Sequence, residues 1–327
     1  MAEITHEYSL EHFNQQIQYA IKHYQLHGLK SADFSNIIIC GLGGSGIGGR
    51  IAKAYFADKG HLPIEVYSDY TLPKYTSSKT LVILSSYSGT TEETLAMYDQ
   101  AKAIGCKIIC ISSGGDLLEK TLADKNMLYR VETGYQPRMA LGFSLTYNLL
   151  LLGELFGFNT ANELENTASI YRNSAEYKEM ASAVLETFAG KENQKFAVVT
   201  DNPTEAVGIR FCQQLQENAK AEAFVNVLPE ANHNVFETYY GTLPTNFIFI
   251  NSHSNDRNTG RFAYLKQLLE KQGNTVFEIS LPNASLYELY KCIYITDWVS
   301  IYLSDKRGTD KMSVPNIAGL KNFLKTF

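Results

Sequence analysis

The sequence predicts an α/β protein built from two successive units, each a mainly parallel β-sheet flanked by helices. Two observations support this prediction. Short apolar runs rich in β-branched residues alternate with longer helical stretches, and the alternation starts again in the second half of the chain. Strands buried on both faces of a parallel sheet form such continuous apolar runs. The 327 residues suffice for about two domains. We expect an N-terminal domain over 1–155, a helical linker over 156–190 and a C-terminal domain over 191–327.

The first unit is expected to begin with an amphipathic helix over 9–27 that precedes its sheet. Its strands are the apolar runs at 37–40, 64–67, 81–84, 107–111 and, more weakly, 127–131. Helices follow the first run, to about residue 56, and the third run, over 91–104. Two further helical stretches, at 139–157 and 161–188, lead to the second unit, and the later one is polar enough to be a linker.

The second unit repeats the alternation of strands and helices. Its expected strands lie at 196–200, 223–227, 247–251 and 275–281, and its expected helices at 204–218, 258–272, 284–304 and 316–326. No close residue-by-residue repeat relates the two halves, so we expect a duplicated architecture and not a duplicated sequence.

The composition is that of an ordinary globular protein, with 45% hydrophobic and 19% charged residues. A net charge of −5 gives no electrostatic reason to expect a nucleic-acid partner. No apolar run approaches the roughly 18 residues of a membrane span, and the best candidate, 139–158, is interrupted by Gly142, Asn148, Gly153 and Glu154. We therefore expect a buried helix there and no membrane partner. The N-terminus lacks the basic segment and apolar core of a signal peptide.

The cysteines are odd in number and form no zinc-type CxxC pair. They are Cys40, Cys106, Cys110, Cys212 and Cys292. We expect free thiols and a cytoplasmic protein, because the cytoplasm is reducing. No cluster of His, Asp and Glu has the spacing of metal ligands, so neither a metal nor another cofactor is expected.

The stretch 81–94, LVILSSYSGTTEET, joins an apolar strand to a hydroxyl-rich loop and the start of a helix. Such a loop delivers hydroxyls and backbone N–H groups to one point, and the helix adds the positive end of its dipole. One hydroxyl would be enough to cap the helix, whereas this loop carries Ser85, Ser86, Ser88, Thr90 and Thr91. The loop therefore predicts a site for a phosphate ester or another dianion.

A glycine-rich loop at 41–49, GLGGSGIGG, follows the first strand and opens a helix. It satisfies the G-x-G-x-x-G fingerprint of dinucleotide sites, and Asp69 follows the second strand, where a ribose-binding acid would stand. An NAD(P)-dependent oxidoreductase is therefore an alternative. However, Ser45 adds a hydroxyl within the glycines, and both loops leave the carboxyl edge of a parallel sheet, where Ser45 and the hydroxyls of 86–88 can converge. A dinucleotide site does not need that second cluster, which favours a phosphate ester.

The two loops together resemble the sugar isomerase (SIS) domain, which binds phosphosugars. Three later motifs, YQPR at 135–138, QENAK at 216–220 and PEANHN at 229–234, are similar in kind and order to those of the two-SIS-domain bifunctional phosphoglucose/phosphomannose isomerase family. The resemblance spans most of the chain. It implies two SIS domains and a metal-independent aldose–ketose isomerase that interconverts glucose 6-phosphate, and mannose 6-phosphate, with fructose 6-phosphate through a cis-enediol. It also implies a homodimer.

The resemblance implies a role for each residue of the catalytic site. Glu217 would be the base that carries a proton between C2 and C1. His233, which titrates near neutral pH, would assist ring opening and would come from the partner subunit. Arg138 would stabilise the enediolate with a permanent charge. Lys321 on the C-terminal helix would also act in ring opening, although Lys325 is expected on the same helix face.

The resemblance also implies which residues hold the phosphate group. These are Gly44, Ser45, Ser86, Ser88 and Thr91, and Gly44 would let the backbone approach the ligand closely.

One departure from the family pattern lies at 307–315, which reads RGTDKMSVP where the family commonly has a Pro-Thr-Pro-like stretch. A threonine there is tied in the family to accepting both C2 epimers, and Thr309 and Ser313 are both candidates. Two other functions stay open. A non-catalytic phosphosugar-binding regulator would keep the serine loops without needing Glu217 and His233 together, and an isomerase could act on another phosphosugar, such as arabinose 5-phosphate or a 2-amino sugar. An amidotransferase is not expected, because no Cys or N-terminal amine is placed to release ammonia from glutamine.

Overall fold

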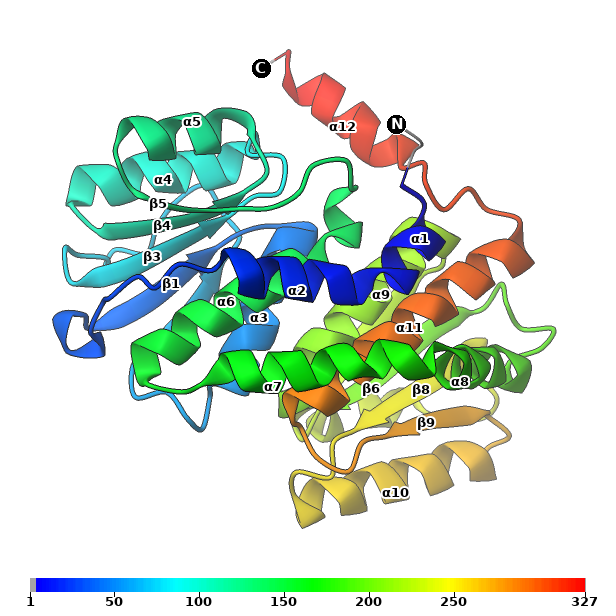
Figure 1. Cartoon of the computed structure of the whole chain (residues 1–327). Coiled ribbons are helices and arrows are strands. Elements are labelled where there is room, and N and C mark those ends of the chain that lie inside the picture. Colours follow the sequence, from blue (N-terminus) through cyan, green and yellow to red (C-terminus); the bar gives the residue numbers. More distant parts are fainter. Residues whose placement is uncertain (1–3, 327) are drawn as a thin grey trace. The chain divides into compact units, whose positions relative to one another are not determined.

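The computed structural model describes residues 4–326, apart from the side chains of residues 172 and 173. The chain divides into two compact units (Figure 1). The first contains Glu11–Arg172 and the short segment Ser285–Tyr287, and the second contains Thr5–Leu10, Asn173–Ala284 and the chain from Glu288 onwards. Each unit is an α/β layer structure with its own sheet, which confirms the predicted fold class.

The first unit is built on a five-stranded sheet with the order β2-β1-β3-β4-β5. Its strands are β1 (Asn36–Cys40), β2 (Ile64–Tyr67), β3 (Thr80–Ser85), β4 (Lys107–Ser112) and β5 (Met127–Arg130). All neighbouring strands are parallel. The central strand β3 is buried along its whole length, as its continuous apolar run predicts.

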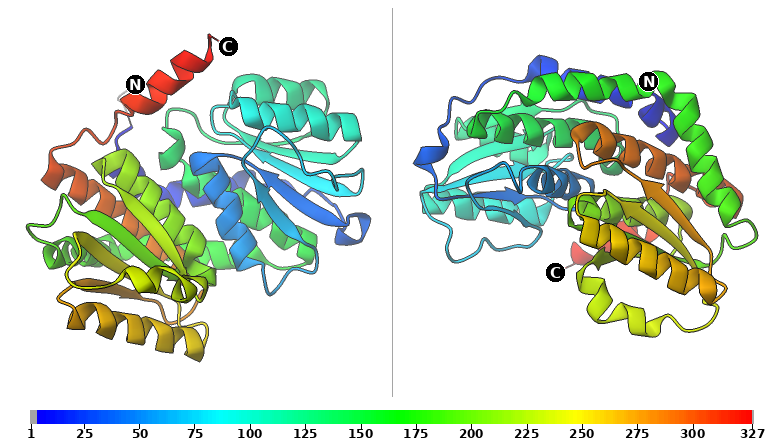
Figure 2. Two further views of the ribbon diagram at one scale, coloured as in Figure 1. Left: turned by 180° about the vertical axis from the view of Figure 1, so that it is seen from behind. Right: turned by 90° about the horizontal axis from the view of Figure 1, so that it is seen from below.

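Helices cover both faces of this sheet (Figures 1 and 2). They are α2 (Phe13–His23), α3 (Gly43–Tyr55), α4 (Glu92–Ile104), α5 (Gly115–Ala123) and α6 (Leu141–Phe156). One core joins Val82 and Ile108 of the sheet to Met97 and Tyr98 of α4. On α6, every residue from 141 to 153 is buried, which confirms the expected buried helix. None of the described helices is long and apolar enough to cross a membrane.

The second unit has a four-stranded parallel sheet with the order β7-β6-β8-β9. Its strands are β6 (Lys195–Asp201), β7 (Ala223–Leu228), β8 (Thr245–Asn251) and β9 (Val276–Ser280). Its later helices are α9 (Glu205–Ala219), α10 (Asp256–Lys271), α11 (Leu286–Arg307) and α12 (Pro315–Leu324). Helix α10 packs Phe262 and Leu265 on one face of the sheet, against Phe247 and Phe249. Helices α9 and α11 lie on the other face (Figure 2).

Two expected helices are each divided in the structure. The stretch expected over 9–27 forms α1 (His6–Glu11) and α2, and α2 ends at His23 because Tyr24 is extended. The stretch expected over 161–188 forms α7 (Thr160–Thr167), a 3₁₀ segment (Ala168–Asn173) and α8 (Ser174–Thr187). Helices α7 and α8 belong to different units. Hydrophobic periodicity could not reveal this break, because both sides of it are helical.

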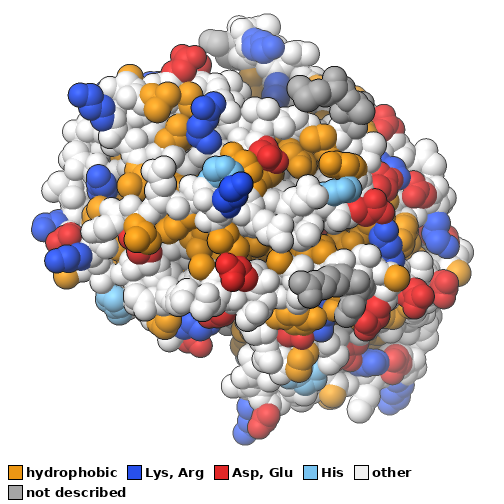
Figure 3. All heavy atoms as spheres, viewed as in Figure 1, with side chains coloured by type: hydrophobic (Ala, Val, Ile, Leu, Met, Phe, Trp, Pro, Cys, Tyr) orange, Lys and Arg blue, Asp and Glu red, His pale blue; other side chains and the backbone are white. Residues whose placement is uncertain are grey.

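The exposed surface carries charges of both signs. On the face shown in Figure 3, the acidic and basic side chains are interspersed and are not gathered into patches of one sign. This distribution accords with the modest net charge of −5.

Candidate active site

The two loops that the sequence predicts to converge do meet at the carboxyl edge of the first sheet. Their strands, β1 and β3, are direct neighbours. The Ser45 hydroxyl, at the start of α3, accepts a hydrogen bond from the Tyr87 N–H at 3.0 Å. A Cβ added to Gly41 would lie 2.9 Å from the Ser85 carbonyl oxygen, so only glycine lets the loops approach so closely. The glycine loop and the serine loop therefore form one connected surface.

The hydroxyls of this surface mostly accept hydrogen bonds from backbone N–H groups. Ser86 Oγ accepts from the Gly89 N–H at 3.1 Å and lies 2.9 Å from Thr91 Oγ1. Ser88 Oγ accepts from the Thr90 N–H at 3.3 Å. A hydroxyl that accepts from the backbone keeps its own proton to donate. Donor protons held in place beside two helix N-termini are the chemistry that an anionic oxygen needs.

The serines of this loop differ in their exposure. Ser45 and Ser86 are 7% and 2% exposed, and Ser88 and Thr90 face solvent. Ser85, which the sequence placed in the same hydroxyl cluster, is 1% exposed and lines a small internal cavity of about 10 Å³ with Ser45. The Ser85 hydroxyl is buried without a hydrogen-bond partner among the described residues, so it takes no part in the hydrogen bonds that join the two loops.

Gly44 brings the turn that carries Arg138 against the glycine loop. A Cβ on Gly44 would lie 2.6 Å from the Pro137 carbonyl oxygen and 3.1 Å from Arg138 Cα. The turn is a 3₁₀ helix (Pro137–Met139), and Gln16 Nε2 fixes it by donating to the Met139 carbonyl at 2.8 Å. Arg138 is 6% exposed. The structure thus brings Arg138 to the same edge as the predicted phosphate residues.

In the second unit, Glu217 lies in the last turn of α9 and lines a pocket of about 620 Å³. Lys220 and the first residues of α12, from Pro315 to Ile317, line the same pocket. This volume falls in the range of small-molecule sites. Lys321 lies on α12 and is exposed, but it is not among the residues that line the pocket. Lys325 follows the end of α12, so the two lysines are not on one continuous helix.

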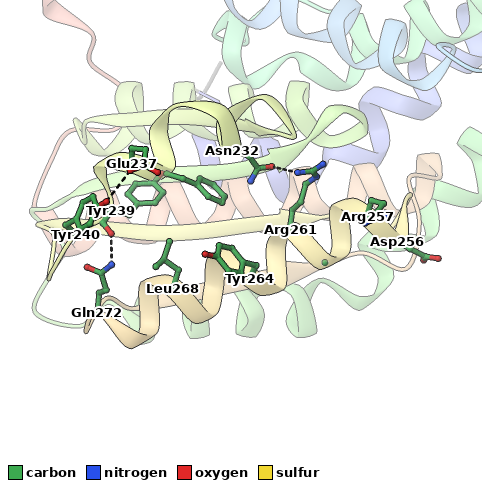
Figure 4. Close-up of a pocket in the computed structure, with 12 residues that line it drawn as sticks. Asn232, Glu237, Tyr239, Tyr240, Asp256, Arg257, Arg261, Tyr264, Leu268 and Gln272 are labelled. Carbon is green, nitrogen blue, oxygen red and sulfur yellow. Dashed lines mark hydrogen bonds between the residues drawn. The ribbon is translucent and has the colours of Figure 1, made fainter.

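His233 ends a short 3₁₀ helix (Glu230–His233) and is exposed. It does not line the pocket of Glu217. Beside its turn lies a second pocket of about 680 Å³, between this segment and α10 (Figure 4). Arg261 reaches from α10 and donates to Asn232 Oδ1 at 3.2 Å. Sequence reasoning missed this pocket, because the helix expected over 258–272 includes Arg261 but not Arg257, and only the structure begins α10 at Asp256 and so places both arginines on one helix.

The second unit repeats the Ser-x-Ser pattern, at 252–254 after β8, but an internal carboxylate occupies it. Strand register places Asp201 where the first unit has Gly41. The Asp201 carboxylate accepts from Ser252 Oγ at 2.5 Å and from Thr204 Oγ1 at 2.7 Å. These hydroxyls are therefore engaged within the protein. In the first unit, by contrast, no carboxylate among the described residues accepts a hydrogen bond from Ser45, Ser86 or Ser88.

The described residues contain no group of three or more His, Cys, Asp and Glu side chains that could hold a metal ion. The five cysteines are free thiols, as expected. Burial raises the pKa of Cys110, Cys212 and Cys292 to about 12. A thiol with so high a pKa is not a nucleophile near neutral pH, so these cysteines do not supply covalent chemistry.

Comparisons with known proteins identify the family. The model of the SIS domain matches residues 29–151, and the model of the bacterial phospho-glucose isomerase C-terminal SIS domain matches residues 160–324. The chain is 35% identical over 311 residues to the bifunctional phosphoglucose/phosphomannose isomerase of Caldicellulosiruptor bescii, which covers 90% of this chain and 91% of that protein. The chain belongs to the bifunctional phosphoglucose/phosphomannose isomerase family. The family's protein from Aquifex aeolicus is 32% identical over 89% of this chain and 91% of its own length.

Solved structures of other proteins have the same fold as this member of the phosphoglucose/phosphomannose isomerase family. The C-terminal domain of glucosamine-fructose-6-phosphate aminotransferase from Francisella tularensis superposes with a TM-score of 0.75, over 93% of this chain and 97% of that one, at 14% identity. Glucosamine-6-phosphate deaminase from Thermotoga maritima gives 0.71, over 93% and 96%, at 17% identity. At such identities the likeness shows the two-SIS-domain fold, as the sequence predicted, and not an activity.

Proposed function

We propose that this protein interconverts glucose 6-phosphate, and mannose 6-phosphate, with fructose 6-phosphate by a metal-independent proton transfer. The observation that carries the proposal is the connected hydroxyl surface in the first unit, where Ser45 and Ser88 keep protons to donate and the hydrogen-bonded pair Ser86–Thr91 keeps one. Membership of the family supports the choice of reaction. In this proposal Gly44, Ser45, Ser86, Ser88 and Thr91 hold the phosphate group and so fix the sugar's position.

Four residues divide the chemistry. Lys321 and His233 open the ring by moving protons between the ring oxygen and O1. The Glu217 carboxylate then removes the C2 proton, and a double bond forms between C1 and C2. The Arg138 guanidinium stabilises the charge that develops on O1. Glu217 returns the same proton to C1 while the O2 hydroxyl proton passes to O1, so an aldose becomes a ketose without any external oxidant or reductant.

The experiment that tests the reaction is fructose 6-phosphate production by the purified protein from each aldose separately, with EDTA present. We expect turnover of both sugars, unchanged by the chelator. Turnover of glucose 6-phosphate alone would show that mannose 6-phosphate, the other C2 epimer, is not a substrate. Tight binding of phosphosugars without turnover would instead support a regulator. Glucosamine 6-phosphate belongs in the same assay, because a relative from Sulfolobus acidocaldarius named D-glucosamine-6-phosphate 4-epimerase is 34% identical over 68% of this chain.

We further propose a cytoplasmic homodimer in which the partner subunit's His233 completes each active site. The exposure of His233, and its absence from the pocket that Glu217 lines, support a role outside its own chain. Free thiols without a disulfide suit a reducing compartment.

Mixing two inactive variants tests the shared site. Glu217→Gln and His233→Ala homodimers are each expected to be inactive. After subunit exchange, a heterodimer has one site with both Glu217 and the partner's His233, so about a quarter of the wild-type activity should return. The control is each variant taken through the same exchange procedure alone. If both residues acted within one chain, no heterodimer site would be intact and no activity would return.

A further inference from the structure

The helix that carries Glu217 ends in an unusual way. Lys220, the C-cap of α9, has a φ of +53°, in the left-handed region that favours glycine. A side chain in this conformation costs about 1 kcal/mol relative to glycine. Glycine would end the helix without this cost, and the contacts of the Lys220 side chain oppose it.

The Lys220 ammonium makes these contacts through three hydrogen bonds. Its Nζ donates to the carbonyl oxygens of Glu217 at 2.5 Å, Asp310 at 2.8 Å and Ser313 at 2.7 Å. An ammonium has three protons, so these three carbonyls engage all of them. Lys220 therefore has no proton left for a substrate, although it lines the same pocket as Glu217. It connects the last turn of α9 to the segment between α11 and α12.

The same segment and the last residue of α11 hold two more carbonyls at this helix end. Thr309 Oγ1 donates to the Asn218 carbonyl at 3.0 Å, and an Arg307 guanidinium nitrogen donates to the Lys220 carbonyl at 3.2 Å. The last carbonyls of a helix have no partner within the helix and form the negative end of its dipole. Here two cations and a hydroxyl satisfy them. We refer to Arg307–Ser313, together with Lys220, as the α9 clamp.

We propose that Lys220 is a positioning residue that fixes Glu217 in the geometry needed for proton transfer. This inference rests on the proposed role of Glu217 as the base. The clamp acts on the carbonyl of Glu217 itself and on the turn that aims its side chain. It also joins α9 to the residues that lead into α12, at Pro315, so that both walls of the pocket are set by one contact.

Charged groups of both signs surround the last turn of α9. Lys220 and Arg307 bring positive charge to the helix end, and Glu222 of the pocket wall and Asp310 of the clamp bring negative charge. The Asp310 carboxylate already accepts from the Met312 N–H at 2.8 Å.

Lys125 offers a matched control. It also has a left-handed backbone, with a φ of +55°, it also follows a helix, α5, and it is exposed as Lys220 is. Among the described residues, however, the Lys125 ammonium forms none of the hydrogen bonds to carbonyl oxygens that the Lys220 ammonium makes. At both positions a change to glycine relieves the backbone cost. At residue 220 this relief opposes the loss of three hydrogen bonds, so both variants should remain folded, and the melting temperature of each is measured beside its activity. Lys125→Gly should keep the wild-type kcat. Lys220→Gly should lower kcat at least tenfold with little change in KM.

The full experiment measures kcat and KM for Lys220→Gly, Lys220→Met and Lys220→Arg. Methionine keeps the length but cannot donate to the three carbonyls, so it should lower kcat as glycine does, and arginine should restore part of kcat. A Lys220→Gly protein that is stable and has wild-type kcat would overturn the proposal, as would equal losses in both glycine variants. Glu217→Gln distinguishes failure of this inference from failure of the proposed function. Full activity of Glu217→Gln would refute the role of Glu217 as the base. An inactive Glu217→Gln together with a fully active Lys220→Gly would refute only the positioning role of Lys220.

Discussion

Replacing Glu217 by glutamine is expected to lower kcat for fructose 6-phosphate formation by about 10²- to 10⁴-fold, the usual contribution of a general base. Glutamine has the same shape as glutamate but cannot take up a proton. The side chain lies in the last turn of α9 and lines a pocket of about 620 Å³, so the substitution adds no volume to a packed core. Phosphosugar binding should persist, because the hydroxyl surface of the first unit is unchanged.

The measurement is steady-state turnover together with the melting temperature of the variant. Glu205→Gln is the matched control, because Glu205 lies at the opposite end of the same helix and is exposed. This control should retain wild-type kcat. A Glu217→Gln protein with kcat within twofold of wild type would show that another group carries the proton.

Replacing Arg210 by methionine should destabilise the protein by about 3–5 kcal/mol, the usual cost of breaking a buried ion pair. Arg210 on α9 and Asp297 on α11 lie 2.6 Å apart, and they are 2% and 0% exposed. Methionine would leave a buried carboxylate without its cation. A second polar pair joins the same helices, since Asn218 Nδ2 donates to Ser300 Oγ at 3.0 Å, so α9 should loosen without detaching.

The loss should depend on pH. Burial raises the pKa of Asp297, and the Arg210 charge opposes that rise. Without Arg210 the folded-state pKa rises further above its unfolded value, so the native state holds a proton that the unfolded state releases. Stability of the variant should therefore fall as pH rises, and its deficit should be smaller at pH 5 than at pH 8. Urea unfolding at the two pH values measures this.

The double variant Arg210→Met/Asp297→Asn completes the cycle. It removes both charges, so it should be more stable at pH 8 than Arg210→Met alone, and its stability should depend less on pH. If the single and the double variant lost the same free energy of unfolding at pH 8, the unpaired Asp297 charge would not be the cause.

Local sequence patterns located the elements well. The apolar run expected at 107–111 is β4 (Lys107–Ser112), and the run expected at 196–200 is β6 (Lys195–Asp201). Such runs are short, β-branched and bounded by glycine, serine or charged residues, so they identify strands without reference to the rest of the chain. The helix breaks near residues 12 and 168 were not predictable in this way, because packing against different units decides them.

For the site residues, too, local patterns predicted one part and the tertiary structure decided the other. The loop pattern named Ser45, Ser86 and Ser88, and the structure joins the two loops through the Ser45–Tyr87 hydrogen bond. The pattern did not separate Ser85 from its neighbours, because Ser85 is the last residue of β3 and is buried with the rest of that strand. The roles of Glu217, Arg138, His233 and Lys321 came from the family resemblance and remain predictions for this chain.

The sequence by itself determined the two α/β units, the glycine-rich and serine-rich loops and the family, because periodicity and short motifs are local properties. Only the tertiary structure decided that the hydroxyls of the second Ser-x-Ser loop are engaged within the protein, since Asp201 accepts from Ser252 and belongs to a strand some fifty residues earlier in the chain. It also decided how α9 ends, because Lys220 meets the carbonyls of Asp310 and Ser313 across about ninety residues. Hydrogen-bond partners that distant in sequence are set by folding and packing, and no local pattern records them.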